Sequence, residues 1–531
     1  MDGQGFVHGG VGSEGGGVAR SGGGFVGPCL GVGFATALAM WVLGYITHLP
    51  GVSPETTEQK AVVGVAMLVV LGLGLSLGGA AIDGGVRRVL VGGLVSGLVC
   101  GLVNLGILGS LISQPPVEGG TTVAPGAGAT AGGFLALTMV LGAVSAEVGR
   151  RVYRGRGEDG VFSLGLRADG KGWRFRLCVL AAVSVVPVLL TGGLVTSQNA
   201  GLAVPDWPNS YTANMFLYPL SKMTGGIYFE HTHRLFGSLA GVGCVVAFGY
   251  ALWSGARGMV VGSARRGVLL AFVAGVAVLV QGLLGGLRVA VADGSADVSA
   301  WKEQARAEVY TGRAHSADYA LTVDNATSLN LAAAHGVSGQ VTFALLAVIA
   351  AMLSPRWLSR SGDSEGSARS DGLLRWSAYV LFGASVVQLS LGSLTRHHES
   401  LITLLLHASL GTLVFVVAAM AGFRALSRHR ETAVLRRLGG VLIGVVTGQF
   451  LLGWGATFFN APLYDGTRSA EPAMAVLAAT AHQAMGALFL ANAALLAAWG
   501  FRLARLPRPR VAESGSAAAA VARVGGRAEP A

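Results

Sequence analysis

Long apolar runs separated by short polar segments dominate the chain, and their length decides the class of structure. A helix that crosses the hydrocarbon core of a membrane needs about 20 mostly apolar residues. Runs of this kind recur along the whole chain, which predicts an all-α polytopic membrane protein with about 12 transmembrane helices. The predicted helices cover residues 25–47, 61–82, 89–113, 125–147, 176–197, 231–253, 268–291, 329–353, 376–394, 402–424, 438–459 and 474–503.

Composition and charge support this interpretation and limit the function classes. Of the 531 residues, 52% are hydrophobic and only 12% are charged, and the mean hydropathy is +0.59, far from a soluble domain. The formal net charge of +11 would suit a nucleic-acid binder, but Lys and Arg gather in every second loop instead. By the positive-inside rule these loops and both termini face the cytoplasm. We therefore expect a multi-pass protein of the cell membrane, surrounded by the lipid bilayer, with no nucleic-acid partner.

The polar segments also divide the chain into units. The widest interruption, GRRVYRGRGEDGVFSLGLRADGKGWRFR at 149–176, is basic and typical of a cytoplasmic linker. The four glycine-rich helices before it carry no ionisable side chain that the pattern marks as buried, and no role follows for them. The polar outer loop at 293–328 is expected to be an accessory insertion. The predicted units are a four-helix extension at 1–148, the linker at 149–175, a first four-helix half at 176–355, a second linker at 356–375, a second four-helix half at 376–504 and a disordered cytoplasmic tail at 505–531.

An internal repeat joins the last eight predicted helices. A histidine near the start of every second helix is followed four residues later by glycine, in HRLFG, HGVSG, HASLG and HQAMG. Three intervening helices carry a Gln with glycine four residues later, in QGLLGG, QLSLGS and GQFLLGWG, whereas VLLTGGL keeps the glycines without the Gln. Because four helices restore the direction of the chain, both halves share one orientation and all four histidines are expected near the outer face. These histidines are His233, His335, His407 and His482.

The spacing of histidine and glycine predicts a particular chemistry. Residues i and i+4 share a helix face, so each glycine leaves a flat recess one turn from the imidazole. A broad planar ligand could enter that recess while its metal takes the ring nitrogen, which is the pattern of a haem site. Pairing within each half gives His233 with His335, and His407 with His482, as ligands of haem iron. Two alternatives stay open: small-xxx-small patterns also serve helix packing in lipid, and zinc is disfavoured because no Cys, Asp or Glu accompanies each histidine.

Charged residues near the predicted outer face are further candidates for the site. Glu230 lies three residues before His233, where a carboxylate could exchange a proton or balance developing positive charge. The alternative for Glu230 is an interfacial acid that the helix dipole favours. Arg234, Arg288 and Arg396 are candidates for pairing with haem propionates. Interfacial arginines also snorkel, which is the alternative for these three.

The other histidines and one aromatic loop give weaker signals. His231 is out of phase with the haem-type histidine two residues later and is expected at the membrane interface. His397 is expected to be solvated or to meet a substrate at the outer face, and His429 is expected to be solvated. The loop NAGLAVPDWPNSYTANMFLYP at 199–219 is rich in Pro, Trp and Tyr, and we expect it to lie in the headgroup layer.

Together these motifs resemble a known family. GLAVPDWPNSY, EHTHRLFGS, AAAHG, the TRH before the tenth helix, LLHASLG and ATAHQAMGA are similar to segments of haem A synthase, over roughly residues 176–503. That family is an eight-helix membrane enzyme with two pseudo-symmetric four-helix halves. It converts haem O to haem A by oxidising a ring methyl to a formyl group in two successive hydroxylations. The resemblance therefore implies molecular oxygen and an external electron donor, which the residues do not identify, with haem O synthase and a terminal oxidase as candidate partners.

The resemblance also implies roles for individual residues. In the family the C-terminal pair holds a haem b cofactor, which corresponds here to His407 and His482. The N-terminal pair corresponds to His233 and His335 and is the expected seat of the haem O substrate, and the catalytic glutamate corresponds to Glu230. The chain departs from the family in three ways: it lacks the outer-loop cysteine pair of some members, its loop after the TRH motif is short, and its first four helices have no counterpart.

Two other functions remain open from the residues alone. A dihaem membrane cytochrome that only passes electrons, for example from quinol, would need the same four histidines. Glu230 favours the enzyme, because a pure electron carrier has less need of an acid beside one macrocycle. A twelve-span transporter is indicated by helix number alone. It fits poorly, because the titratable groups crowd one face instead of the midplane.

Overall fold

The computed structural model of the chain describes residues 23–113, 123–154, 170–204, 206–211, 213–256, 264–292, 326–358, 371–464 and 473–504. Within these ranges it contains 12 helices long and apolar enough to cross a membrane. The predicted fold class, an all-α polytopic membrane protein, is confirmed. The expected accessory loop at 293–328 and the expected tail at 505–531 fall mostly or wholly outside the described residues.

Each predicted apolar run corresponds to one long helix: eight runs lie wholly within their helix and four overrun one end by one or two residues, and most helices extend beyond the predicted ends. The reason is that the hydrocarbon core fixes only the apolar part of a helix, while polar residues continue it into the interface. The long helices are α1 (Gly23–Thr47), α2 (Thr57–Ala81), α3 (Val86–Ile112), α4 (Ala127–Arg154), α5 (Gly170–Ser197), α6 (Gly225–Ala256), α7 (Ala264–Ala292), α9 (Ala326–Met352), α12 (Gly372–His398), α13 (Leu401–Arg428), α14 (Ala433–Tyr464) and α15 (Ala473–Ala504). The short helices η1 (Met215–Leu217), η2 (Leu220–Lys222) and α10 (Pro355–Leu358) lie in the connections.

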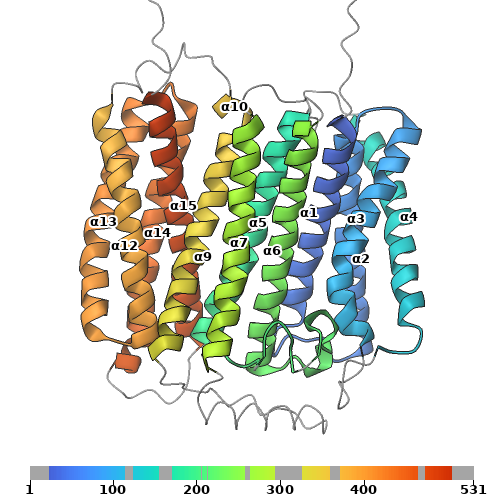
Figure 1. The fold of residues 1–531 in the computed structure, drawn as a ribbon, viewed down its shortest axis with the longest axis horizontal. Coiled ribbons are helices and arrows are strands. Elements are labelled where there is room, and N and C mark those ends of the chain that lie inside the picture. Colours follow the sequence, from blue (N-terminus) through green and yellow to red (C-terminus); the bar gives the residue numbers. More distant parts are fainter. Residues whose placement is uncertain are drawn as a thin grey trace, which may run out of the picture.

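The long helices stand side by side in three groups, which follow one another across the molecule (Figure 1). In the middle group, α5 and α7 each pack against both α6 and α9, so α6 and α9 lie diagonally across a four-helix bundle. The group at one end repeats this arrangement, with α12 and α14 each packed against both α13 and α15. Contacts of α15 with α5 and α9, and of α12 with α9, join the two bundles. The two four-helix halves predicted from the repeat are therefore two packed bundles.

The N-terminal bundle, α1 to α4, is held by close backbone approach. A Cβ at Gly93 or Gly97 of α3 would strike the backbone of α4, and one at Gly142 of α4 would strike that of α3. Small residues allow such contacts between membrane helices. The bundle is not a separate unit, because α1 also packs against α5 and α6, and Val32 of α1 shares one buried cluster with Leu177 of α5.

Two expectations about the basic ends of the helices are wrong. The linker predicted at 149–175 is helical at both ends, since α4 continues to Arg154 and α5 begins at Gly170. The first four helices do bury an ionisable group: Glu147 is 9% exposed and accepts hydrogen bonds from Arg150 at 2.6 and 2.7 Å and from Arg151 at 2.9 Å. A buried carboxylate needs such partners, and arginines one turn along the helix supply them.

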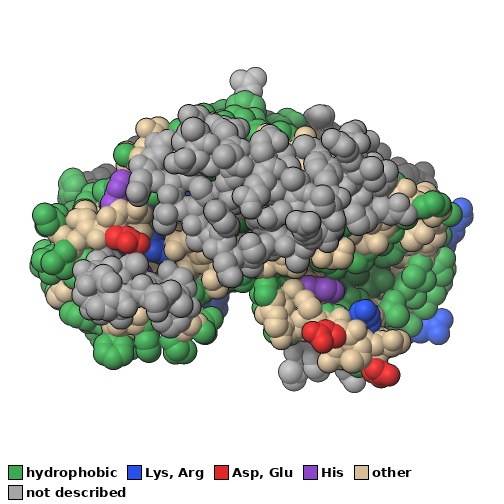
Figure 2. Space-filling model, turned by 90° about the horizontal axis from the view of Figure 1, so that it is seen from below, with side chains coloured by type: hydrophobic (Ala, Val, Ile, Leu, Met, Phe, Trp, Pro, Cys, Tyr) green, Lys and Arg blue, Asp and Glu red, His purple; other side chains and the backbone are tan. Residues whose placement is uncertain are grey.

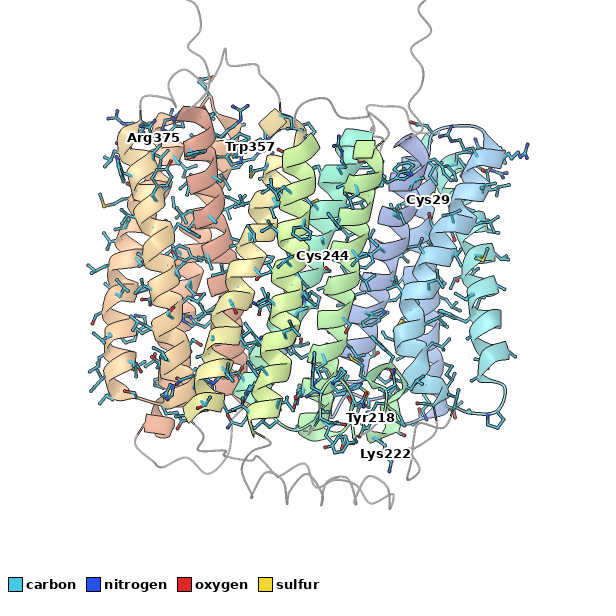
Figure 3. All side chains as sticks on the ribbon, in the orientation of Figure 1. Cys29, Tyr218, Lys222, Cys244, Trp357 and Arg375 are labelled. Atoms are coloured by element: carbon cyan, nitrogen blue, oxygen red, sulfur yellow. The ribbon has the colours of Figure 1, made fainter. Side chains whose placement is uncertain are left out.

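The two ends of the molecule differ in chemistry. Tyr218 and Lys222 lie at one end, and Trp357 and Arg375 lie at the other (Figure 3). We refer to the first as the loop end, because residues 199–223 fold there. Figure 2 shows the loop end face on, with hydrophobic side chains along much of the rim and charged side chains in small groups between polar and backbone atoms.

At the opposite end a charged cluster caps α12. Asp371 accepts a hydrogen bond from the Leu374 N–H at 3.0 Å, from Arg424 Nε at 2.9 Å and from His429 Nε2 at 2.8 Å. Burial acts to raise the pKa of Asp371, but these donors outweigh it and hold the pKa below its ordinary value of 3.8. His429 is only 2% exposed, so the expectation that it is solvated is wrong: the chain after α13 folds back under the start of α12.

Candidate functional site

The structure brings the four haem-type histidines together in the two pairs that the sequence predicts. His233 of α6 faces His335 of α9 with ring centroids 6.2 Å apart, and His407 of α13 faces His482 of α15 at 6.1 Å. The rings of each pair are nearly perpendicular, at 89° and 85°. Because each pair joins diagonal helices of one bundle, both pairs lie between all four helices of their half. The role of these residues as metal ligands stays a prediction.

Each imidazole stands on a glycine of the preceding helix. A Cβ would lie 2.9 Å from the ring of His233 if it were added at Gly192, 2.7 Å from His407 at Gly392 and 2.9 Å from His482 at Gly453. These distances are too short for real Cβ contacts, so only glycine lets the rings occupy these positions. At the fourth ring, His335 on Gly285, the distance is 3.5 Å, an ordinary contact.

The residue four positions before each of these glycines orients the ring through its backbone. The Nδ1 atoms of His233, His407 and His482 lie 3.1, 3.0 and 3.1 Å from the carbonyl oxygens of Val188, Gln388 and Gln449. A carbonyl can only accept, so Nδ1 carries the proton and Nε2 keeps the lone pair that could bind a metal. At His407 and His482 this Nε2 lies 3.5 and 3.3 Å from the amide nitrogens of Gln388 and Gln449. His335 Nδ1 faces the carbonyl of Gln281 but lies outside hydrogen-bonding geometry.

The ring spacing fits a metal held between two opposed imidazoles. Two metal–nitrogen bonds of roughly 2 Å and two ring radii of roughly 1.2 Å place the centroids of opposed ligands about 6.4 Å apart. The measured 6.2 and 6.1 Å match this spacing. Among the described residues, no three His, Cys, Asp or Glu side chains gather in a possible metal group. Structural zinc uses four such ligands and catalytic zinc usually three, so the donor set fits axial ligation of haem iron better.

Glu230 and Arg234 hold the outer loop onto α6. Glu230 is 4% exposed, and its two oxygens accept from Arg234 Nη2 at 2.6 Å and from the Val204 N–H at 2.9 Å. Arg234 also donates to the carbonyl oxygens of Val204 at 3.0 Å and Asp206 at 2.5 Å. A buried ion pair is stable only when such hydrogen bonds satisfy its remaining atoms. Arg234 therefore has a structural task in the loop, and its contact with a propionate stays a prediction.

The loop packs as a folded cap, which neither expectation for this region included. His231 is fully buried: its Nδ1 lies 2.9 Å from Ser210 Oγ, and its ring centroid lies 5.2 Å from that of Tyr218. Tyr211 and Tyr218 are fully buried as well, and the expected position of the loop in the headgroup layer stays a prediction. Burial raises the pKa of both phenols, so they stay neutral, and Tyr211 donates to the Ala203 carbonyl at 2.6 Å.

The two other candidate arginines differ in how they are bound. Arg396 of α12 donates to the Thr196 carbonyl of α5 at 2.7 Å, so it links the two bundles near the loop end. Arg288 of α7 lies against Gly201 of the loop, and its Nε is buried without a hydrogen-bond partner among the residues that the structure describes. Burying a guanidinium N–H without an acceptor costs free energy, so an anion or another acceptor would stabilise Arg288 here. His397 is half-buried and lies near both arginines.

The glutamines of the repeat are the residues whose use the sequence did not reveal. The glycine four residues after each histidine was expected to leave a recess for a planar ligand. In three of the four positions that recess instead receives the side chain of a Gln from the preceding helix, Gln281 at Gly339, Gln388 at Gly411 and Gln449 at Gly486. The Gln-x-x-x-Gly motif was the available signal in the sequence. Only the packing shows that the Gln carbonyl orients the histidine while the Gln side chain lies beside the glycine four residues after that histidine.

The surroundings of the two pairs are thus unequal. Glu230, Arg288 and the outer loop lie around the first pair, whereas Leu404 stands three residues before His407, where Glu230 stands before His233. No protein-family model, no curated protein and no solved structure matches the chain. Its own residues and their geometry are therefore the basis on which a function can be assigned.

Proposed function

We propose that this protein is a haem A synthase, which oxidises a ring methyl of haem O to a formyl group and uses haem b as its cofactor. The observation that carries the proposal is the presence of two opposed imidazole pairs, at 6.2 and 6.1 Å between centroids, one in each four-helix bundle. The spacing suits axial ligands on both sides of an iron. Each half then offers a seat for one macrocycle, as the resemblance to haem A synthase implies.

The second pair, His407 and His482, is assigned to haem b, and the first pair, His233 and His335, to haem O. The unequal surroundings support this order. A cofactor that relays electrons needs a fixed seat, whereas a reacting macrocycle also needs protein groups at its edge. Among the described residues, only the first pair has a buried carboxylate three residues before one of its histidines and a folded loop beside it.

When bound, haem b would supply electrons to the reaction at the first pair. Each hydroxylation takes an oxygen molecule, a pair of electrons and a pair of protons, and it releases a water molecule. The electrons come from an external donor that the structure does not identify. We assign the delivery of protons at the substrate edge to the Glu230 carboxylate, and we assign the exclusion of bulk water to the loop that Glu230 and Arg234 hold in place.

The arginines near the loop end have a separate part in this proposal. Arg288 has a buried Nε without a partner in the described part of the chain, and a propionate of the substrate would satisfy it. Arg396 is already bonded to α5 through Thr196, so its proposed contact with the cofactor uses the rest of its guanidinium. Charged ends of both macrocycles would then point toward the loop end.

A dihaem membrane cytochrome is the second candidate, and one observation favours it. Both oxygens of Glu230 already accept hydrogen bonds, as expected of a residue that only holds a loop. An electron carrier would use the same two pairs without any reaction at the macrocycle. The two candidates differ in their product, since only the enzyme forms haem A.

The deciding experiment is expression of the full chain in membranes that contain a haem O source, followed by extraction and chromatography of the pigments. We expect haem A to appear, and to be missing in cells that carry His335→Ala. Unchanged haem O together with a bis-histidine b-type spectrum would instead assign the chain to the electron carriers. The same membranes without a haem O source provide the background.

The multi-pass fold places the protein in a membrane. We propose the cell membrane as its location, with both termini in the cytoplasm and the histidine pairs toward the outer face. Arg375 lies at the end opposite to the loop (Figure 3), and Arg424 and Arg502 donate to Asp371 and Trp357 at the same end, which supports this orientation. Haem O synthase and a terminal oxidase are the proposed partners, as supplier of the substrate and user of the product.

A further inference from the structure

The four histidine positions are equivalent in backbone geometry, which allows a direct comparison of what lies beside them. In each case the residue four positions before the supporting glycine presents its carbonyl to Nδ1, and the residue four positions after the histidine is glycine. The carbonyl comes from Gln281, Gln388 and Gln449 at three positions, and from Val188 at the position of His233. The second glycines are Gly237, Gly339, Gly411 and Gly486.

At three positions the Gln side chain fills the space beside the second glycine. A Cβ at Gly339 would lie 3.4 Å from Gln281 Oε1, one at Gly411 2.9 Å from Gln388 Nε2, and one at Gly486 3.1 Å from Gln449 Nε2. In the second bundle the same amides lie 3.5 and 3.3 Å from Nε2 of His407 and His482. Both recesses of the second pair are therefore closed by carboxamides.

The recess beside His233 is open. A Cβ at Gly237 would meet no atom of the described residues within 4 Å. The residue that presents the carbonyl here is Val188, whose side chain is shorter than that of Gln. Gly237 shares a helix face with His233, which points at His335 across the bundle. The space is consequently inside the first bundle, one turn farther from the loop end than His233, and Val188, which stands where the other three positions have Gln, is apolar.

A second, independent feature of the same pair lies nearer the loop end than the histidines. Arg288 is three residues beyond Gly285, the glycine under His335, and so stands almost one turn nearer the loop end. In the described part of the chain its buried Nε has no hydrogen-bond partner. The first pair therefore combines a buried guanidinium nitrogen that can still donate, toward the loop end, with an open space away from it. This polarity matches a macrocycle that carries carboxylates at one edge and a long apolar substituent at another.

We infer that the replacement of Gln by Val188 makes the first pair selective for a prenylated macrocycle, with the recess at Gly237 receiving the start of its isoprenoid chain. The inference rests on the proposed function, because haem O differs from haem b by an isoprenoid chain in place of a vinyl group. Gln388 and Gln449 close the corresponding spaces of the second pair and restrict it to haem b. Selection between substrate and cofactor then depends on the side chain of one residue, whose carbonyl also orients His233.

The test measures binding, so that it does not depend on turnover. The full chain with His407→Ala and His482→Ala, which removes both histidines of the second pair, is titrated with haem b and with haem O, and binding is followed by absorbance and by extraction of the bound pigment. We expect this protein to prefer haem O. Adding Val188→Gln should lower the affinity for haem O by about tenfold or more, with the affinity for haem b retained, because filling an apolar pocket excludes a bulky group. Val188→Thr is the matched control, since it keeps the size and branching of valine, and should leave the preference unchanged.

A reciprocal variant keeps the inference testable if Val188→Gln fails to fold. In a His233→Ala background, Gln449→Val opens a space beside Gly486 and should allow the second pair to bind haem O. Unchanged haem O affinity in a folded Val188→Gln protein, or no gain in folded Gln449→Val, would overturn the inference. If the unmodified chain prefers haem O at the first pair but forms no haem A, the proposed function fails and the selectivity stands. If it forms haem A and Val188→Gln binds haem O normally, only the selectivity fails.

Discussion

The α5–α9 bundle and the α12–α15 bundle place their histidines in the same way but differ in what surrounds them. Both expose apolar side chains, such as Leu279 in the first and Phe458 in the second, but the first also packs against α1 and carries the folded loop at one end. The contacts of the rings differ in one place. Both rings of the second pair lie within 2.9 Å of a Cβ added at their glycines, whereas the distance for His335 at Gly285 is 3.5 Å, and its Nδ1 has no hydrogen-bond partner in the described part of the chain.

This difference indicates how a duplicated bundle can serve two purposes. The second bundle grips both rings and fills both recesses, which favours a permanent ligand in one position. The first bundle has one looser ring, one open recess and a carboxylate nearby, which favours a ligand that enters, reacts and leaves. The N-terminal bundle supports only this changeable half in the contacts we describe: α3 packs against η1, and Tyr45 of α1 stacks on Tyr228 of α6 with centroids 5.5 Å apart.

The largest expected effect separates the two pairs by removing one ligand. His482→Ala should abolish the bis-histidine b-type absorbance and stop haem A formation, while haem O still binds at the first pair. Removal of one axial ligand leaves the iron with a single histidine. Absorbance spectra and pigment extraction of the purified protein provide the measurement. His398→Ala, at an exposed histidine of the loop end, should change neither, and an intact b-type spectrum in His482→Ala would contradict the assignment.

The next effect concerns the carboxylate that only the first bundle has. Glu230→Ala and Glu230→Gln should keep haem bound but reduce the conversion of haem O by about 100-fold or more, the usual cost of losing a general acid or base. Haem content and haem A yield are measured on the same membranes. Glu230→Gln can still accept from the Val204 N–H, so the loop should stay in place. Full conversion in Glu230→Gln would reduce Glu230 to a residue that positions the loop.

A smaller effect tests the grip on the rings. Gly392→Ala places a Cβ 2.7 Å from the His407 ring, whereas Gly285→Ala places one 3.5 Å from His335. Overpacking of this kind costs about 1–3 kcal/mol, so Gly392→Ala should weaken haem binding at the second pair by roughly tenfold or more. Gly285→Ala should leave binding at the first pair nearly unchanged. Gly383→Ala, where a Cβ meets nothing within 4 Å, is the control in a titration with haem b, and equal affinities for all three would show that the glycines do not seat the rings.

The smallest effect concerns the charged cap of the second bundle, which is far from the histidines. Because the folded pKa of Asp371 lies below its ordinary value of 3.8, its stabilising contribution is complete above that value and is lost as pH falls through the folded pKa. Asp371→Asn should lower the free energy of unfolding near pH 7 by about 1–3 kcal/mol, the range for a lost hydrogen-bonded charge. Thermal unfolding of both proteins is compared at pH 7 and near pH 3, and the difference between their unfolding temperatures should become smaller in acid. An equal difference at both pH values would show that the charge of Asp371 does not stabilise the fold.

Much of the fold followed from the sequence, because membrane helices are specified by local properties. Apolar length alone located all twelve long helices, and the histidine repeat divided the last eight into two bundles and paired the rings correctly. Where the expectations failed or were incomplete, the cause was a contact distant in sequence. Burial of His231 depends on Ser210 and Tyr218, and burial of His429 depends on Asp371, 58 residues away. Neither partner is marked by any local pattern.

By itself, therefore, the sequence determined the number of helices, their grouping and the identity of the opposed histidines, since hydrophobic length and a four-residue spacing are properties of a single helix. Only the tertiary structure decided what each residue beside those histidines does. It placed the glycines under the rings, turned three Gln side chains into the neighbouring recesses and left the recess beside Gly237 open. The reason is that such spaces lie between two helices, and their filling depends on which side chains meet there rather than on the order of residues along either one.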